Sequence, residues 1–192
     1  MKSIYTFILS FLCALTAVSC QPKTQLDPDA LWQLGLDYEN GTNGVTQDSA
    51  LAYKSYLQSA EAGNAIGYYL VGHCFQHGIG VEENHKLSYE NYKKSFDMLT
   101  ELAKAKDDMI ILNFLGSAYY WGDGTERDFE KAAECYLRSA DMGNPETQYK
   151  IGKCYEEGTG LEQDMDEALE WYSKSAEQGF AAAIERLQDF QK

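Results

Sequence analysis

The chain has 192 residues, of which 44% are hydrophobic and 24% charged, and its formal net charge at pH 7 is −14. This hydrophobic content excludes disorder over most of the chain, and the length suits one domain or one repeat array. A surface with this much negative charge repels nucleic-acid phosphates and anionic lipids, so we expect neither as a partner.

The first 19 residues are predicted to be an export signal rather than part of the fold. Lys2 gives a positive start, residues 4–18 are almost wholly apolar, and Ser19 and Cys20 follow. An apolar stretch of this length is too short to span a membrane. Residues 20–28 contain two prolines and no periodic pattern, which predicts a tether between this N-terminus and the folded body.

The end of the signal, Ala17-Val18-Ser19-Cys20, resembles the lipobox of bacterial lipoproteins, although Leu is usual where Ala17 stands. In that family the signal is cut before the cysteine, whose sulfur then takes a diacylglycerol. The resemblance implies lipidation at Cys20 and a mature chain held on the bacterial cell envelope, facing the periplasm or the surface. The alternative is an ordinary signal peptide cut nearby, which leaves Cys20 unmodified.

A pattern of glycines and aromatic residues then occurs four times. An anchor glycine inside an apolar helical pattern is followed by an aromatic residue three positions later and by a second glycine six positions later. A third glycine, an Asp or Asn and a Tyr complete the unit. The anchor glycines are Gly35, Gly72, Gly116 and Gly152. Their intervals of 37, 44 and 36 residues indicate a stacked array of repeats.

Each unit is predicted to be a hairpin of two helices. Apolar residues flank the anchor glycine at helical spacing, and the second glycine suits the left-handed end of the first helix. The second helix is expected to begin after Asp48, Asn84, Asp128 or Asp164. We expect a neighbouring helix to approach each anchor glycine closely. The predicted units are residues 29–64, 65–108, 109–144 and 145–180, with a polar capping helix at 181–192.

Unit two is longer than the others. From Tyr92 to the next anchor glycine there are 24 residues, against 16 in the other two intervals. The extra eight residues, around 98–106, keep helical spacing. The second helix of this unit is therefore predicted to be longer by about two turns.

The repeated pattern A-x-x-x-L-G-x-x-Y-x-x-G-x-G, followed by D-x-x-x-A-x-x-x-Y-x-x-S-A-x-x-G, resembles the Sel-one-like repeat. That family is a cousin of the tetratricopeptide repeat, and the resemblance covers nearly all of the mature body. It implies an all-α fold, an α/α solenoid of four helical hairpins plus a C-terminal capping helix over residues 29–192. The family serves as an adaptor surface in many settings, so the resemblance identifies a fold rather than one function.

Three cysteines lie within the repeats. Cys74 and Cys154 share one repeat position two units apart, which is too far for a disulfide. Cys135 and Cys154 lie on helices expected to be neighbours, and an exported protein can form a bond there. The preferred interpretation is that all three are small buried packing residues.

No group of residues has the pattern of a catalytic site or a cofactor site. His73 and His77 have the i, i+4 spacing of metal ligands on one helix face. No third ligand is evident, and His77 also suits the C-terminal end of a helix. We therefore expect neither enzymatic activity nor a bound metal or cofactor.

The resemblance to tetratricopeptide arrays implies that the other face of the first helices lines a concave groove. The expected lining residues are Trp32, Leu36, Glu39 and Asn40; Tyr69, His73, Gln76 and His77; Asn113, Ser117, Tyr120 and Trp121; and Tyr149, Lys153, Glu156 and Glu157. Exposed Trp and Tyr are typical of binding hot spots. The alternative is that individual rings pack between adjacent repeats.

These observations predict a non-enzymatic, membrane-tethered scaffold that binds a protein or peptide. Glu39, Glu156 and Glu157 favour a basic partner. One alternative is an immunity-type protein that neutralises a toxin delivered to the envelope. A weaker alternative is an enzyme that hydrolyses envelope polymers, which needs a pocket with convergent groups of shifted pKa.

Overall fold

The structure, a computed structural model, describes residues 27–190, so the predicted signal, most of the tether and Cys20 lie outside the described residues. Within this range it contains helices and no strands. The helices are α2 (Pro28–Asn40), α3 (Ser49–Glu61), α4 (Ala65–His77), α5 (His85–Ala105), α6 (Met109–Trp121), α7 (Phe129–Asp141), α8 (Pro145–Glu157), α9 (Met165–Glu177) and α10 (Ala181–Asp189). The predicted all-α array of four hairpins and a C-terminal helix is confirmed.

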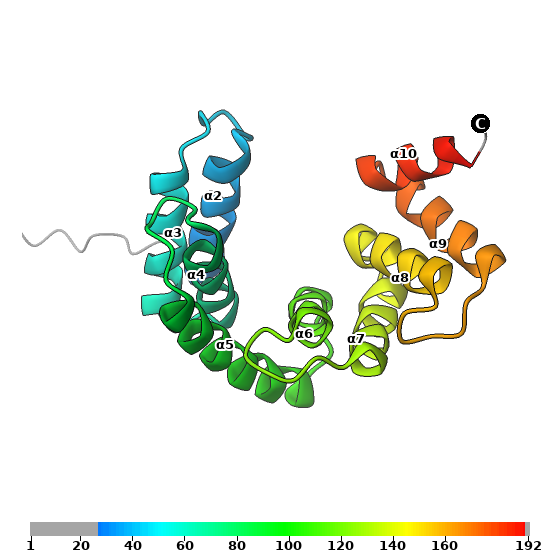
Figure 1. Cartoon of the computed structure of the whole chain (residues 1–192). Helices are drawn as coiled ribbons and strands as arrows, with labels where there is room; N and C mark the ends of the chain where they lie inside the picture. The colour runs from blue at the N-terminus through cyan, green and yellow to red at the C-terminus, as the bar shows by residue number, and fades with distance from the viewer. Residues whose placement is uncertain (1–26, 191–192) are drawn as a thin grey trace, which may run out of the picture.

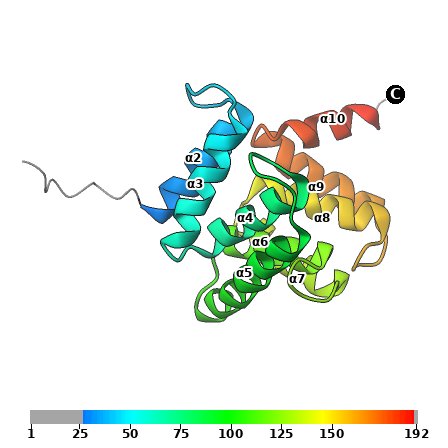
Figure 2. The ribbon, with the colours of Figure 1, turned by 60° about the vertical axis from the view of Figure 1, so that its left-hand side comes forward.

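The hairpins form a curved array (Figure 1). The first helix of each hairpin (α2, α4, α6 and α8), followed by α10, lies on the inner side, and the second helices α3, α5, α7 and α9 lie on the outer side. Successive hairpins are rotated relative to one another, so the array is a superhelix rather than a flat stack (Figure 2). Among the helices of residues 27–190, none combines the length and apolar composition needed to cross a bilayer.

The helix ends follow the predicted capping residues. The side chains of Asp48, Asn84, Asp128 and Asp164 accept hydrogen bonds from backbone amides in the first turn of the second helices. The first helices end at glycines with left-handed backbone, at φ 67 to 80°: Gly41, Gly78, Gly122 and Gly158. Side-chain caps of this kind typically contribute about 1 kcal/mol each, and glycine adopts the left-handed end without steric cost.

Each anchor glycine contacts the ring of the tyrosine in the second helix of its own unit. A Cβ atom on Gly152, for example, would lie 2.7 Å from Cδ1 of Tyr172. The same relationship joins Gly35 to Tyr56 and Gly72 to Tyr92. The expected close approach is confirmed, and its cause is the tyrosine ring, which occupies the space that a side chain at the glycine would need.

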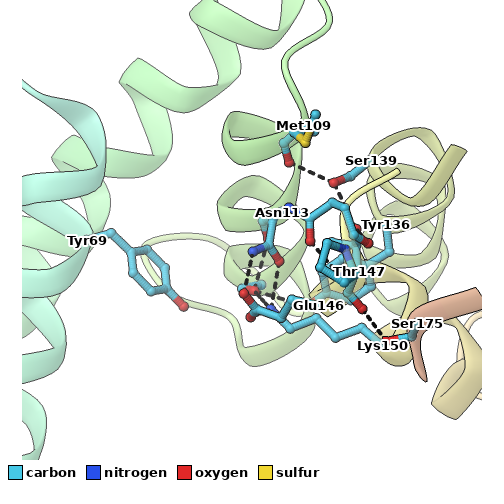
Figure 3. A network of polar contacts seen from close by, with 12 residues as sticks. Tyr69, Met109, Asn113, Tyr136, Ser139, Glu146, Thr147, Lys150 and Ser175 are labelled. Carbon is cyan, nitrogen blue, oxygen red and sulfur yellow. Dashed lines mark hydrogen bonds and ion pairs between the residues drawn. The ribbon is translucent and has the colours of Figure 1, made fainter. Parts of the chain in front are cut away.

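A serine of each second helix forms a hydrogen bond to the start of the first helix of the same hairpin. The four serines are fully buried, and each donates to the backbone carbonyl of the first residue of its own hairpin at 2.6 to 2.7 Å. The pairs are Ser59–Pro28, Ser95–Ala65, Ser139–Met109 and Ser175–Pro145. Figure 3 shows the bond from Ser139 to Met109. Each bond therefore joins the start of the first helix to the second helix of the same hairpin.

The predicted extension of the second helix in unit two is confirmed, because α5 has 21 residues while the other second helices have 13. The extension changes how unit three docks. The third glycine of units two and four, Gly80 or Gly160, packs on the first residue of the preceding second helix. In unit three, Gly124 packs instead on Tyr92 and Lys93, the eighth and ninth residues of α5. Unit three is thus displaced along α5 by about two turns, or about 12 Å.

Cys74, Cys135 and Cys154 are free and buried, as the packing interpretation predicts. Burial raises the pKa of Cys154 to about 11 and that of Cys74 to about 12. Thiols with such high pKa values are poor nucleophiles at neutral pH. These residues therefore act as small apolar side chains in the core.

Candidate binding surface on the concave face

Two adjoining cavities lie on the inner side of the array. The large cavity, of about 600 Å³, is lined by Leu36, Glu39, Tyr69, Leu70, His73, Gln76, His77, Tyr92, Ser117, Trp121, Asp123 and Arg127. The small cavity, of about 270 Å³, is lined by Tyr120, Trp121, Tyr136, Glu146, Tyr149, Lys150, Lys153, Cys154, Glu157 and Phe180. These volumes are within or near the range of pockets that hold a small molecule or a few side chains.

Trp121 is the residue that the two cavities share. It is the last residue of α6 and is 62% exposed. Its indole makes an edge contact with Tyr120, at 4.9 Å between ring centroids. Because Tyr120 also contacts Phe129, a short row of rings supports the exposed indole from one side.

The structure corrects the expectation that the groove aromatics Trp32, Tyr69, Trp121 and Tyr149 are all exposed. Trp32 and Tyr69 are each only 8% exposed. Phe114 makes edge contacts with both rings, at 6.2 Å from Trp32 and 5.2 Å from Tyr69. Packing between repeats, the alternative interpretation, therefore holds for these two residues. Tyr149 is half-buried in the small cavity, and of the four only Trp121 is largely exposed.

Asn113 was also expected to line the groove, but it is buried within a polar network between units three and four (Figure 3). Its amide donates to Glu146 Oε2 at 3.1 Å, and its Oδ1 accepts from Lys150 Nζ at 2.7 Å. Lys150 also donates to Ser117 Oγ at 3.1 Å and pairs with Glu146 at 2.7 Å. Tyr136 donates to the same Ser117 hydroxyl at 3.2 Å. This network joins two units and leaves Asn113 unavailable to a partner.

In units one and four, a glutamate accepts a hydrogen bond from the tyrosine that contacts the anchor glycine. Tyr56 donates to Glu39 Oε2, and Tyr172 donates to Glu156 Oε2, both at 2.6 Å. Glu156 also forms an ion pair with Arg186 of α10, which holds the pKa of its carboxyl below the usual range. Glu156 is therefore already paired within the chain and lines neither cavity.

Asp123 is a site residue that the sequence pattern did not indicate. It lies in the loop after α6, and its Oδ2 accepts a hydrogen bond of 2.7 Å from the hydroxyl of Tyr69. Burial raises the pKa of Asp123, and the bond from Tyr69 opposes that shift. Only the displacement of unit three along α5 brings this loop to Tyr69, so the pattern within one unit carried no signal for it.

His73 and His77 lie side by side at the edge of the large cavity, with ring centroids 4.5 Å apart. Burial lowers the pKa of His73, and the neighbouring His77 lowers it further. Within residues 27–190, no three His, Cys, Asp or Glu side chains come close enough together to hold a metal ion.

The remaining expected groove residues divide between the two cavities. Leu36, Glu39, Gln76 and the two histidines line the large one, and Tyr120, Lys153 and Glu157 line the small one. Lys153 and Glu157 form a pair at 3.5 Å. Asn40, at the end of α2, is exposed and lines neither cavity.

Comparison with known proteins agrees with the repeat pattern. The family model described as Sel1 repeat matches residues 28–64, 65–98, 112–144 and 145–180. Chitin synthase regulatory factor 3 of Schizosaccharomyces pombe is 26% identical over 129 residues, which are 66% of this chain and 13% of that protein. The chain therefore spans only about an eighth of the length of that relative.

Solved structures with similar folds come from several bacteria. A Sel1 repeat protein from Oxalobacter formigenes has a TM-score of 0.46 and 25% identity, with 90% of this chain and 80% of that chain covered. The immunity protein Pa5087 of Pseudomonas aeruginosa has a TM-score of 0.47 and 17% identity, covering 81% of this chain and 67% of that chain. At these TM-scores, neither structure carries information on what this chain binds.

Proposed function

This chain belongs to the Sel1 repeat family, whose members mediate protein–protein interactions, and from that premise we propose that it is a non-enzymatic scaffold. Its concave face binds another protein or a peptide, with Trp121 as the central anchor. The observation that carries the proposal is the position of Trp121, exposed on the inner side between two cavities.

The energetics of an exposed indole favour this role. Covering a Trp side chain on binding contributes about 2–4 kcal/mol, and Trp is among the residues most enriched in interface hot spots. The cavities on either side of Trp121 offer room for partner side chains next to the anchor. An adjoining pair of cavities suits an extended peptide or a protruding loop better than a single compact ligand.

The charge of the chain favours a basic partner. The formal net charge is −14, and the carboxylates Glu39 and Asp123 line the large cavity. A negative surface steers a positively charged partner towards it and repels an acidic one.

We further propose that the scaffold is tethered by lipid at Cys20 to the bacterial cell envelope. The support is the apolar segment 4–18 followed by the lipobox-like residues 17–20. A lipid anchor and a flexible tether would leave the concave face free to meet a partner near the membrane.

Photo-cross-linking in the cells that express this protein tests the proposed function. A benzophenone amino acid is placed at Lys153, which lines the small cavity together with Trp121, so that the indole is kept. The matched control carries it at Tyr89 of α5, which is 60% exposed and lines neither cavity. We expect a discrete protein adduct from residue 153 and none from residue 89. Identical adducts from both positions, or none from residue 153, would contradict a concave binding face.

A further inference from the structure

We propose that the large cavity binds an arginine side chain of the partner, with the carboxylate of Glu39 as its acceptor. This inference rests on the proposed function, because it names the side chain that the concave face selects. The supporting observation is a glutamate that accepts a hydrogen bond from a tyrosine of the same unit. This pair occurs in units one and four, and in unit four an arginine is bound to the glutamate.

The precedent is in unit four. Glu156 is the fourth residue after the anchor Gly152 and accepts the hydroxyl proton of Tyr172. The guanidinium of Arg186 pairs with the same carboxylate, with Nε 3.1 Å from Oε2 and its other nitrogen against Oε1. Both guanidinium contacts are thus made to one carboxylate, the bidentate geometry that is specific to arginine.

Unit one repeats the acceptor but not the donor. Glu39 is the fourth residue after Gly35 and accepts from Tyr56, as Glu156 does from Tyr172. The helix α4 follows unit one as α10 follows unit four. Arg186 is the sixth residue of α10, and the residue at the same position of α4 is Leu70. Leu70 lines the large cavity and has no group that can donate to Glu39. In the part of the chain that the structure describes, Glu39 forms no ion pair, and it faces a cavity of about 600 Å³.

The precedent applies to Glu39 alone. In units two and three the residue at this position is Gln76 or Tyr120, and neither carries a negative charge. The small cavity, which Tyr120 lines, therefore lacks the acceptor that Arg186 uses in unit four.

The other walls of the large cavity suit a guanidinium. Asp123 supplies a second carboxylate, which forms no ion pair within residues 27–190. Trp121 supplies an exposed aromatic surface, on which guanidinium groups stack. The cavity also contains Arg127, but its guanidinium lies over the ring of Phe129, at 5.7 Å from the centroid. Burial lowers the pKa of His73 and so favours its neutral form.

The long α5 helix is what brings the two carboxylates to one cavity. Because Gly124 packs on the eighth and ninth residues of α5, the adjacent Asp123 lies against Tyr69, the fifth residue of α4. After a second helix of ordinary length, the corresponding loop packs about two turns earlier, at the first residue of that helix, as Gly80 and Gly160 show. The insertion in unit two thus contributes to the proposed site, because it places the second carboxylate, that of Asp123, in the large cavity.

The test uses small probes and the full-length chain in detergent micelles. N-acetyl-arginine methylamide and N-acetyl-lysine methylamide are titrated against the protein, and NMR shifts of the Trp121 indole and the Glu39 carboxyl report binding. We expect the arginine probe to bind at least fivefold more tightly than the lysine probe. Equal affinities, or shifts confined to residues outside the large cavity, would overturn the proposal.

Three variants separate Glu39 from the rest of the concave face. Glu39→Gln keeps an acceptor for Tyr56 and should weaken the arginine probe at least fivefold. Glu157→Gln, in the small cavity, is the matched control and should leave it unchanged. Leu70→Arg copies the arrangement of Arg186 and should abolish binding, because its own guanidinium would fill the site. If Leu70→Arg does not fold, Glu39→Gln is the deciding variant. An arginine-probe affinity for Glu39→Gln equal to that for the wild type would overturn the proposal.

The two proposals fail separately. Cross-linking from residue 153 without arginine selectivity would overturn the arginine site but not the proposed scaffold function. Arginine selectivity without a cross-linked protein would overturn the concave binding of a protein and leave the arginine site as an isolated property of the cavity.

Discussion

The ring of Tyr136 lies against Gly116, where a Cβ atom would come within 2.6 Å of its Cε1. The same contact in the other three units fixes the distance between the two helices of each hairpin. Glycine in the middle of a helix costs about 1 kcal/mol relative to alanine, so the ring packing must contribute more than this cost for the pattern to recur in all four units.

Gly116→Ala should therefore destabilise the protein, although alanine is the better helix former. Overpacking against Tyr136 costs about 1–3 kcal/mol, and the ring cannot move away because it is buried on its other side. Urea unfolding checks the sign. Gly116→Ala in the background of Tyr136→Ala is the control, and there the alanine should be neutral or stabilising. A stabilising effect in the wild-type background would show that the ring does not set the spacing.

Tyr69→Phe should lower the free energy of unfolding by about 1–2 kcal/mol, because it removes a hydrogen bond to a half-buried carboxylate. It should also raise the pKa of Asp123 further, since the bond from Tyr69 opposes the effect of burial. Chemical denaturation and carboxyl NMR measure the two effects. An unchanged pKa of Asp123 would mean that the tyrosine hydroxyl does not stabilise the charged form.

Asp123 should give the protein a characteristic dependence of stability on pH. Its pKa is raised in the folded state, so the folded state binds more protons than the unfolded state between pH 3.8 and that raised pKa. The contribution of Asp123 to stability is therefore lost as the pH rises through this window. Relative to Asp123→Asn, the wild type should become less stable from pH 3.8 upwards. A difference that does not change with pH, or that grows in favour of the wild type, would contradict the burial of this carboxyl.

Arg186→Leu should give unit four the arrangement of unit one. The pKa of the Glu156 carboxyl should rise, because Arg186 is the largest cause of its lowering. Carboxyl NMR measures this pKa, and Lys174→Leu, which removes an ion pair with Glu170 on the outer helix, is the control. If the pKa of Glu156 stays low without Arg186, the arginine is not what stabilises its charge, and the precedent for Glu39 loses its basis.

Most of the fold follows from patterns within one unit. Spacing from Gly116 to Tyr119, Gly122 and Asp128 predicts where the helices of that hairpin begin and end, because capping and glycine conformations are local. The eight extra residues in unit two predict a longer α5 for the same reason.

The candidate site could be predicted only in part, because it depends on contacts between units. Trp32 and Tyr69 lie three residues before the anchor glycines of their units, a position that we expected to face the groove. Phe114 packs against both rings instead. The cause is the displaced docking of unit three, which no periodicity within a unit reveals. Asp123 belongs to a glycine-flanked loop whose partner, Tyr69, lies 54 residues earlier in the chain.

The polar network around Asn113 was missed for a related reason. Its partners Lys150 and Glu146 are four residues apart in α8, the spacing of an ordinary exposed ion pair on a helix. Only the docking of α8 beside α6 turns this pair towards Asn113 and makes it part of the junction between units three and four (Figure 3).

The most direct test of the central claim is the affinity of the cross-linked partner for Trp121→Ala. The variant should bind at least tenfold more weakly than the wild type, a loss of about 1.4 kcal/mol or more, with an unchanged melting temperature because the indole is 62% exposed. Tyr89→Ala, on the outer helix, should bind as the wild type does. Equal affinities of Trp121→Ala and wild type would contradict a binding face centred on Trp121.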